Sequence, residues 1–145
     1  MNEFISTYAA VIWVCLVYGL VYYALMLNGL VVKTRVARRC RDAGEPFLRY
    51  TGNYPDILAA DRAQLNMLEH MPPFLMLLWL QALVVSPESA AWLGSLYVIV
   101  RVTYPFFLGT RITESFPKRV FINTFSGYLI LTIMAGWQVS YLLTQ

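Results

Sequence analysis

Three polar side chains stand at the edge of a long apolar run and could together bind a small charged molecule. They are Arg62, Asn66 and Glu69, which follow one another at i, i+4 and i+7. On a helix this spacing places all three side chains on one face. Ionisable groups at membrane depth are energetically costly and mostly face a bundle interior or a wet cavity. A cation, an amide and a carboxylate on one face predict a site for a zwitterionic ligand.

A second polar stripe lies further along the chain, where Arg101 and Tyr104 follow Tyr97 at helical spacing. Antiparallel helices would bring Arg101 to the depth of Asn66 and Glu69. A single buried pair, such as Glu69 with Arg101, would instead only neutralise two charges. The whole set of polar residues favours a binding site over a structural ion pair.

The segments that carry these residues are apolar enough to lie in a membrane. The chain has 145 residues, of which 59% are hydrophobic and 13% are charged, which is about half the charged share of an average soluble domain. Runs with one charge or none cover 4–32, 70–87, 89–110 and 120–145. Because a span needs roughly 20 apolar residues, we predict an all-α membrane protein, a four-transmembrane-helix bundle of up-down topology in one domain.

The predicted helices cover about 5–35, 56–85, 90–110 and 117–143 of the single membrane domain 1–145. Asp56 is expected to cap the second helix, because a short acceptor can satisfy free backbone N–H groups there. The pair Pro72-Pro73 predicts a kink within the same helix. The sequence Ser115-Phe116-Pro117 is typical of the start of the fourth helix.

The basic residues are gathered in two loops. The first predicted loop region holds Lys33, Arg35, Arg38, Arg39, Arg41 and Arg49, and the third holds Arg111, Lys118 and Arg119. The second link and the two termini contain no lysine or arginine. The positive-inside rule therefore predicts a multi-pass protein with cytoplasmic basic loops and both termini on the opposite side. The expected partners are membrane lipids and not nucleic acid, because the charge lies beside the membrane.

Metal chemistry is not expected. His70 is the only histidine, and the two cysteines have no paired spacing. A transition-metal site would need further nitrogen or sulfur ligands on the same helix or a neighbouring one.

The second-helix motif resembles the superfamily of membrane-associated proteins in eicosanoid and glutathione metabolism. That family's pattern of Arg-Ala-x-x-Asn-x-x-Glu, then proline and Phe-Leu, stands here as Arg62-Ala63, Asn66, Glu69, Pro72 and Phe74-Leu75. Looser matches are the arginine pair Arg38-Arg39 and the third-helix residues Arg101 and Tyr104. The likeness covers nearly the whole chain in length, span count and topology.

The resemblance implies a homotrimer that binds glutathione as cosubstrate between neighbouring subunits, near the cytoplasmic side. The residues expected to bind glutathione are Arg38, Arg62, Gln64, Asn66, Glu69, His70, Arg101 and Tyr104. Arginines can bind its two carboxylates through forked hydrogen bonds. Glu69 suits its ammonium group, and Asn66 suits a peptide group. The implied reaction is a transferase or peroxidase reaction on lipophilic electrophiles or lipid hydroperoxides.

In the enzymes of this family an arginine near the start of the fourth helix stabilises the glutathione thiolate. A cation beside a thiol lowers its pKa, and the thiolate is the nucleophile. Counting along the chain reaches Ser115, so the candidates for this catalytic role are Arg111, Arg119 and Arg39.

Two departures leave other functions open. His70 stands where leukotriene C4 synthase has a tyrosine, and Leu108 replaces a second tyrosine of the third helix. The alternative is a noncatalytic lipid-binding scaffold that resembles the five-lipoxygenase-activating protein. A small transporter or channel subunit is a third hypothesis, although the charges gather at one membrane edge rather than along a path.

Overall fold

Four long helices make up the protein, whose computed structural model describes residues 2–112 and 118–145. They are α1 (Asn2–Asp42), α2 (Pro55–Leu80), α3 (Pro87–Leu108) and α4 (Arg119–Leu143), with a short π-helical turn η1 (Gln81–Val85) that continues α2. Each has the length and apolar composition to cross a membrane, α2 together with η1. No strand occurs in the described ranges. The prediction of an all-α four-helix membrane bundle is confirmed.

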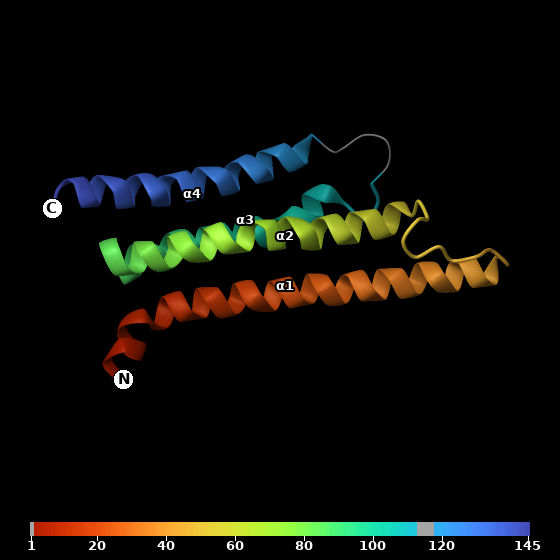
Figure 1. The fold of residues 1–145 in the computed structure, drawn as a ribbon, viewed down its shortest axis with the longest axis horizontal. Helices are drawn as coiled ribbons and strands as arrows, with labels where there is room; N and C mark the ends of the chain where they lie inside the picture. Colours follow the sequence, from red (N-terminus) through yellow and green to blue (C-terminus); the bar gives the residue numbers. More distant parts are fainter. Residues whose placement is uncertain (1, 113–117) are drawn as a thin grey trace.

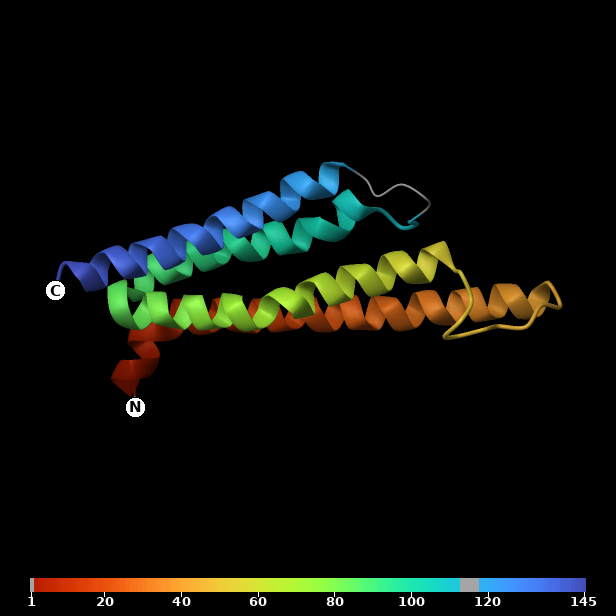
Figure 2. The ribbon, with the colours of Figure 1, turned by 45° about the horizontal axis from the view of Figure 1, so that its top comes forward.

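The helices run up and down, so both termini lie at one end of the molecule and the two longer connections lie at the other (Figure 1). Helix α1 packs on α2 and α3, and α4 packs on α3. Figure 2 shows α1 beside α2 and α4 beside α3 along most of their lengths. We call the end that carries the α1–α2 and α3–α4 connections the basic end, because most lysines and arginines lie there.

An aromatic cluster holds α1, α2 and α3 together in the middle of the bundle. The Phe74 ring lies 4.9 Å from that of Tyr18 and 4.4 Å from that of Tyr97, measured between centroids. The Tyr18 hydroxyl donates a 2.7 Å hydrogen bond to the Met67 carbonyl. Such ring pairs add about 0.5–1.5 kcal/mol each beyond their burial. The cluster therefore fixes the relative depth of three helices one turn from Arg101.

Helix α1 ends at Asp42, beyond the expected limit near residue 35. Its apolar face continues through the buried residues Val36 and Cys40, one turn apart, after the long apolar run has ended. Lys33 adds a 2.7 Å ion pair to Asp61 of α2. The basic segment at the end of α1 is therefore helical, and it packs on α2.

The expected cap at Asp56 is wrong. Helix α2 begins at Pro55, and Tyr54 occupies the N-cap position without a side-chain hydrogen bond. Proline suits the first helical position because it lacks the N–H that would remain unpaired. The Asp56 carboxylate binds two arginines instead. The expected start signal of the fourth helix, Ser115-Phe116-Pro117, lies outside the described residues.

Candidate functional site

The central contact of the predicted site joins α2 to α3. Arg101 Nη1 donates a 2.8 Å hydrogen bond to Asn66 Oδ1. Both side chains are buried, and Arg101 is only 1% exposed. The short connection through η1 makes α2 and α3 antiparallel neighbours, which brings the two residues to the same level. The sequence-based expectation that these helices would place Arg101 at the depth of Asn66 agrees with this contact.

The buried Arg101 guanidinium also contacts Tyr97 of its own helix and Gly127 of α4. Its Cζ lies 4.9 Å from the centre of the Tyr97 ring, an arrangement in which the ring face stabilises the cation. Gly127 of α4 leaves the space that the guanidinium occupies, since a Cβ there would meet Arg101 Nη2. Arg101 Nε, Arg101 Nη2 and the Tyr97 hydroxyl have no hydrogen-bond partner within the described residues. These donors are buried, so a ligand or a water molecule can reach them only if neighbouring side chains move.

Arg62 and Glu69 lie on the same helix and form a loose ion pair. Arg62 Nη1 is 3.7 Å from Glu69 Oε1, and both side chains are about half exposed. Tyr104 of α3 lies within electrostatic reach of Arg62, Arg101 and Glu69. Glu69 therefore pairs with Arg62, and the alternative Glu69–Arg101 pair is not the observed contact. The pair is open enough for both groups to exchange partners for a charged ligand.

His70 is directed toward α4 rather than toward the Arg62–Glu69 pair. Its ring lies 5.2 Å from the ring of Tyr128, and the residue is buried. On α4, Asn123 donates from Nδ2 to the Val100 carbonyl and to Thr103 Oγ1, each at 2.9 Å. These contacts make α4 a wall of the site. Of the predicted set, α2 and α3 bring together Arg62, Asn66, Glu69, His70, Arg101 and Tyr104; we call these six residues the Arg101 cluster.

Two predicted ligands of glutathione lie elsewhere in the protomer. Gln64 is two residues from Asn66, which is about 200° around a helix, and its Oε1 lies near Gly29 of α1. Arg38 is likewise two residues from the buried Val36 and therefore faces away from α2. The structure does not bring Gln64 or Arg38 to the Arg101 cluster of the same protomer.

The three arginines considered for the thiolate have other partners. Asp56 accepts from Arg39 Nη1 at 3.0 Å and pairs with Arg111 Nε at 2.9 Å. Arg119 Nε donates to the Phe107 carbonyl at 2.9 Å. Arg39 and Arg111 thus tie α1 and the segment after α3 to the start of α2. Arg119 ties the start of α4 to the end of α3.

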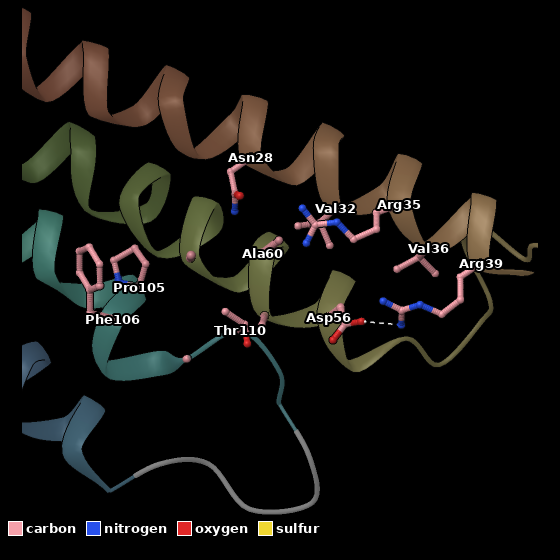
Figure 3. A pocket seen from close by; sticks show the side chains of 13 residues that line it. Asn28, Val32, Arg35, Val36, Arg39, Asp56, Ala60, Pro105, Phe106 and Thr110 are labelled. Carbon is pink, nitrogen blue, oxygen red and sulfur yellow. Dashed lines mark hydrogen bonds and ion pairs between the residues drawn. The ribbon is translucent and has the colours of Figure 1, made fainter.

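A separate cavity opens near the basic end, between α1, the start of α2 and the end of α3. Its volume is about 400 Å³. Figure 3 shows Arg35 and Arg39 extending from α1 over this space, with Asn28 further along the same helix. Of the predicted site residues, only Arg39 lines it. We call it the Arg35 cavity.

Sequence reasoning missed Gly127, Asn123, Arg35 and Asn28. A glycine within an apolar helix gives no sign of the side chain that will fill its space. Asn123 and Asn28 are single polar residues inside apolar runs, which is a usable signal. Arg35 was visible only as one of many basic residues. For metals the part of the chain that the structure describes contains no group of three or more His, Cys, Asp or Glu side chains that could hold an ion.

The arrangement can bind a ligand with both signs of charge. The Arg101 cluster holds two arginines, one carboxylate and one amide, with unpartnered donors on Arg101 and on the adjacent Tyr97. A comparison with curated proteins gives no match. A comparison with family models matches residues 6–140 to the MAPEG family, which covers all four helices and the Arg101 cluster. This chain therefore belongs to the MAPEG family, whose members are membrane proteins of glutathione-related or eicosanoid metabolism.

Proposed function

We propose that the protein is a glutathione-dependent membrane enzyme, a transferase or peroxidase that acts on lipophilic electrophiles or lipid hydroperoxides. The observation that carries the proposal is the contact between Arg101 and Asn66, beside the Arg62–Glu69 pair. Family membership supports a role in glutathione-related metabolism in general. The particular reaction rests on the chemistry of these side chains.

The donors and acceptors of the Arg101 cluster fit glutathione. The two arginines and Glu69 give the cluster a formal charge of +1, and glutathione with a neutral thiol carries −1 from two carboxylates and one ammonium. Arg62 and Glu69 are exposed enough to receive a carboxylate and the ammonium. Arg101 Nε and Nη2 are buried without a partner in the described residues, and they can donate to a ligand oxygen once neighbouring side chains move on binding. Each half of the zwitterion thus meets a group of opposite sign.

The positions of Gln64 and Arg38 support a site shared between subunits. Both face away from Asn66 in one protomer, Gln64 toward Gly29 of α1, so a ligand that contacts all three residues would need two copies of the chain. Part of the site then lies on each side of an interface, which is compatible with a homotrimer. A protomer alone would bind glutathione weakly.

Calorimetry of glutathione binding to the detergent-purified oligomer tests the site. Arg62→Ala and Glu69→Gln are expected to lower affinity by roughly tenfold or more, because each removes a charged hydrogen-bond partner. Arg49→Gln is the matched control, since Arg49 is an exposed loop residue beside Tyr50. Size-exclusion chromatography must show the same oligomer for all variants. Wild-type affinity in both cluster variants would contradict the site.

A noncatalytic lipid-binding scaffold is the second candidate, and the arginine contacts favour it. Arg39, Arg111 and Arg119 all have partners away from the Arg101 cluster. Within the described ranges, these contacts leave none of the three directed at the cluster. Turnover of a generic aryl halide with glutathione separates the two functions. An enzyme gives a saturable rate above the solution reaction, whereas a scaffold gives none.

A further inference from the structure

The Arg35 cavity is distinct from the Arg101 cluster. On α2 it is lined by the small side chains of Ala59, Ala60 and Ala63. No member of the Arg101 cluster lines it. Its volume of about 400 Å³ is in the range of small-ligand pockets. A ligand there would not compete with glutathione for the side chains of the Arg101 cluster.

The lining carries an excess of positive charge. Two arginines and one aspartate line the cavity. Asp56 already binds Arg39 and also takes Arg111 from outside the lining. Arg35 has no ion pair or side-chain hydrogen bond with any residue in the ranges 2–112 and 118–145. The cavity therefore has a formal charge of +1, and Arg35 is its unpaired cation.

Arg35 and Arg39 extend from α1 in the same direction, over the cavity (Figure 3). Long basic side chains near the end of a span usually extend toward the water. In α1 the Cα–Cβ bonds tilt toward the N-terminus, which lies at the opposite end of the bundle (Figure 1). Figure 3 shows Arg35 extending that way, along α1 toward Asn28. Arg35 is exposed in this protomer, so its positive charge is accessible to an anionic group that enters the cavity.

The remaining walls combine further donors with an apolar surface. Asn28 and Thr110 face the cavity from α1 and from the segment after α3, and neither side chain has a hydrogen-bond partner among the residues described. The apolar part includes Pro105 and Phe106, and Phe106 is 76% exposed. The cavity thus offers polar groups to a headgroup and an exposed aromatic ring to a hydrocarbon chain.

We propose that the Arg35 cavity binds the phosphate group of an anionic phospholipid, with Arg35 as the principal ligand and an acyl chain passing over Phe106. Basic pockets between membrane helices near the membrane surface suit acidic headgroups. A net charge of −1 on the lipid complements the +1 of the lining. The quaternary ammonium of phosphatidylcholine would cancel that attraction. Free phosphate would supply the anion but no chain for Phe106 and the alanine wall.

Native mass spectrometry of the full chain in non-ionic detergent tests the proposal. Phosphatidylglycerol, phosphatidylcholine and inorganic phosphate are added separately, and bound ligand and the thermal unfolding midpoint are recorded. We expect saturable retention of phosphatidylglycerol with a raised midpoint and weak effects of the other two. Arg35→Gln should lower phosphatidylglycerol affinity by roughly tenfold or more, and Arg49→Gln should leave it unchanged. Ala60→Leu, which keeps all charges but fills the space, should also weaken retention.

Four results would overturn the assignment. If inorganic phosphate raised the thermal unfolding midpoint as much as phosphatidylglycerol does, the Arg35 cavity would be a site for free anions. Equal losses of phosphatidylglycerol affinity in Arg35→Gln and Arg49→Gln would mean that the lipid binds by general surface charge. Wild-type affinity in both Arg35→Gln and Ala60→Leu would mean that it binds elsewhere. Loss of glutathione binding in Arg35→Gln would place that arginine in the glutathione site. The lipid readout does not depend on catalysis, so a failed glutathione proposal leaves this test intact.

Discussion

The buried guanidinium of Arg101 is the residue on which the site depends. No acidic side chain neutralises it by an ion pair in the described ranges; its guanidinium contacts one amide oxygen, one aromatic ring and the backbone at Gly127. A lone buried cation is costly in an apolar surrounding. Its Nε and Nη2 are buried and have no hydrogen-bond partner within the described ranges, which makes Arg101 the first candidate for a functional contact.

Gly127→Ala is expected to displace Arg101 without changing any charge. The new Cβ would overlap Arg101 Nη2, so the guanidinium must shift and its hydrogen bond to Asn66 is strained. We expect glutathione affinity to fall by roughly tenfold, as for loss of one charged hydrogen bond. Gly136→Ala on the same helix is the control, because nothing lies within 4 Å of its added Cβ. Equal affinities in the two variants would mean that Arg101 does not contact glutathione.

Two substitutions of Asn66 are expected to affect stability and glutathione binding differently. Asn66→Leu removes the acceptor of a buried charged hydrogen bond and should cost about 1–3 kcal/mol of stability. Asn66→Asp restores an acceptor and offsets the buried charge, so its unfolding midpoint should stay near wild type. Its extra negative charge should nevertheless weaken glutathione binding. Thermal unfolding and calorimetry on both variants check this, and wild-type affinity in Asn66→Asp would argue against a carboxylate of glutathione beside Arg101.

At the scale of the elements, Asp56 holds three segments together at the basic end. It binds Arg39 of α1 and Arg111 after α3, and the Ile112 N–H donates to the Pro55 carbonyl at 3.2 Å. Asp56→Asn should cost only about 1 kcal/mol, because both arginines are largely exposed. It should still speed trypsin cleavage after Arg111, since that side chain is released. Asp42→Asn, at the exposed end of α1, is the control that should leave cleavage unchanged.

The opposite end of the bundle has its own polar contacts. Gln138 of α4 donates from Nε2 to the Leu77 carbonyl at 2.9 Å and to Gln81 Oε1 at 3.2 Å, and Gln81 donates to Ser89 Oγ at 3.0 Å. Gln138→Leu should lower stability by about 1–3 kcal/mol because Gln81 is fully buried. Glutathione affinity of the folded protein should not change. A large loss of affinity would connect this end to the site.

Local sequence patterns predicted the helices better than the contacts between their side chains. The apolar runs placed four helices, and the i, i+4, i+7 spacing of Arg62, Asn66 and Glu69 placed one face of α2. The same spacing rule puts Gln64 on the opposite face, so its direction could be predicted from the sequence. The continuation of α1 through Val36 and Cys40 could also be predicted.

The ion-pair partners could not be predicted in this way. Arg39 and Arg111 come from segments far apart in the chain and meet at Asp56 only through packing of α1, α2 and α3. The local pattern at Asp56 indicated a cap, but Tyr54 holds that position. The role of Gly127 depends on how α3 approaches α4, and nothing in the neighbouring sequence encodes that approach.

At the scale of the whole molecule, the polar groups of the protomer lie in separate places. The Arg101 cluster lies among α2, α3 and α4, Arg38 and Gln64 face other directions, and the Arg35 cavity lies near the basic end. A glutathione site completed by a neighbouring subunit would explain why these groups are separated. Cross-linking in the membrane should then capture trimers, and a protein that remains monomeric would contradict the shared site.

The most direct test of the central claim is a glutathione titration of the detergent-purified protein, followed by the ultraviolet absorbance of thiolate. An enzyme that activates glutathione should give a saturable thiolate signal near neutral pH, and the signal should be lost in Arg62→Ala and retained in Arg49→Gln. The absence of any signal in the wild-type protein, together with no heat of binding in calorimetry, would contradict the proposed function.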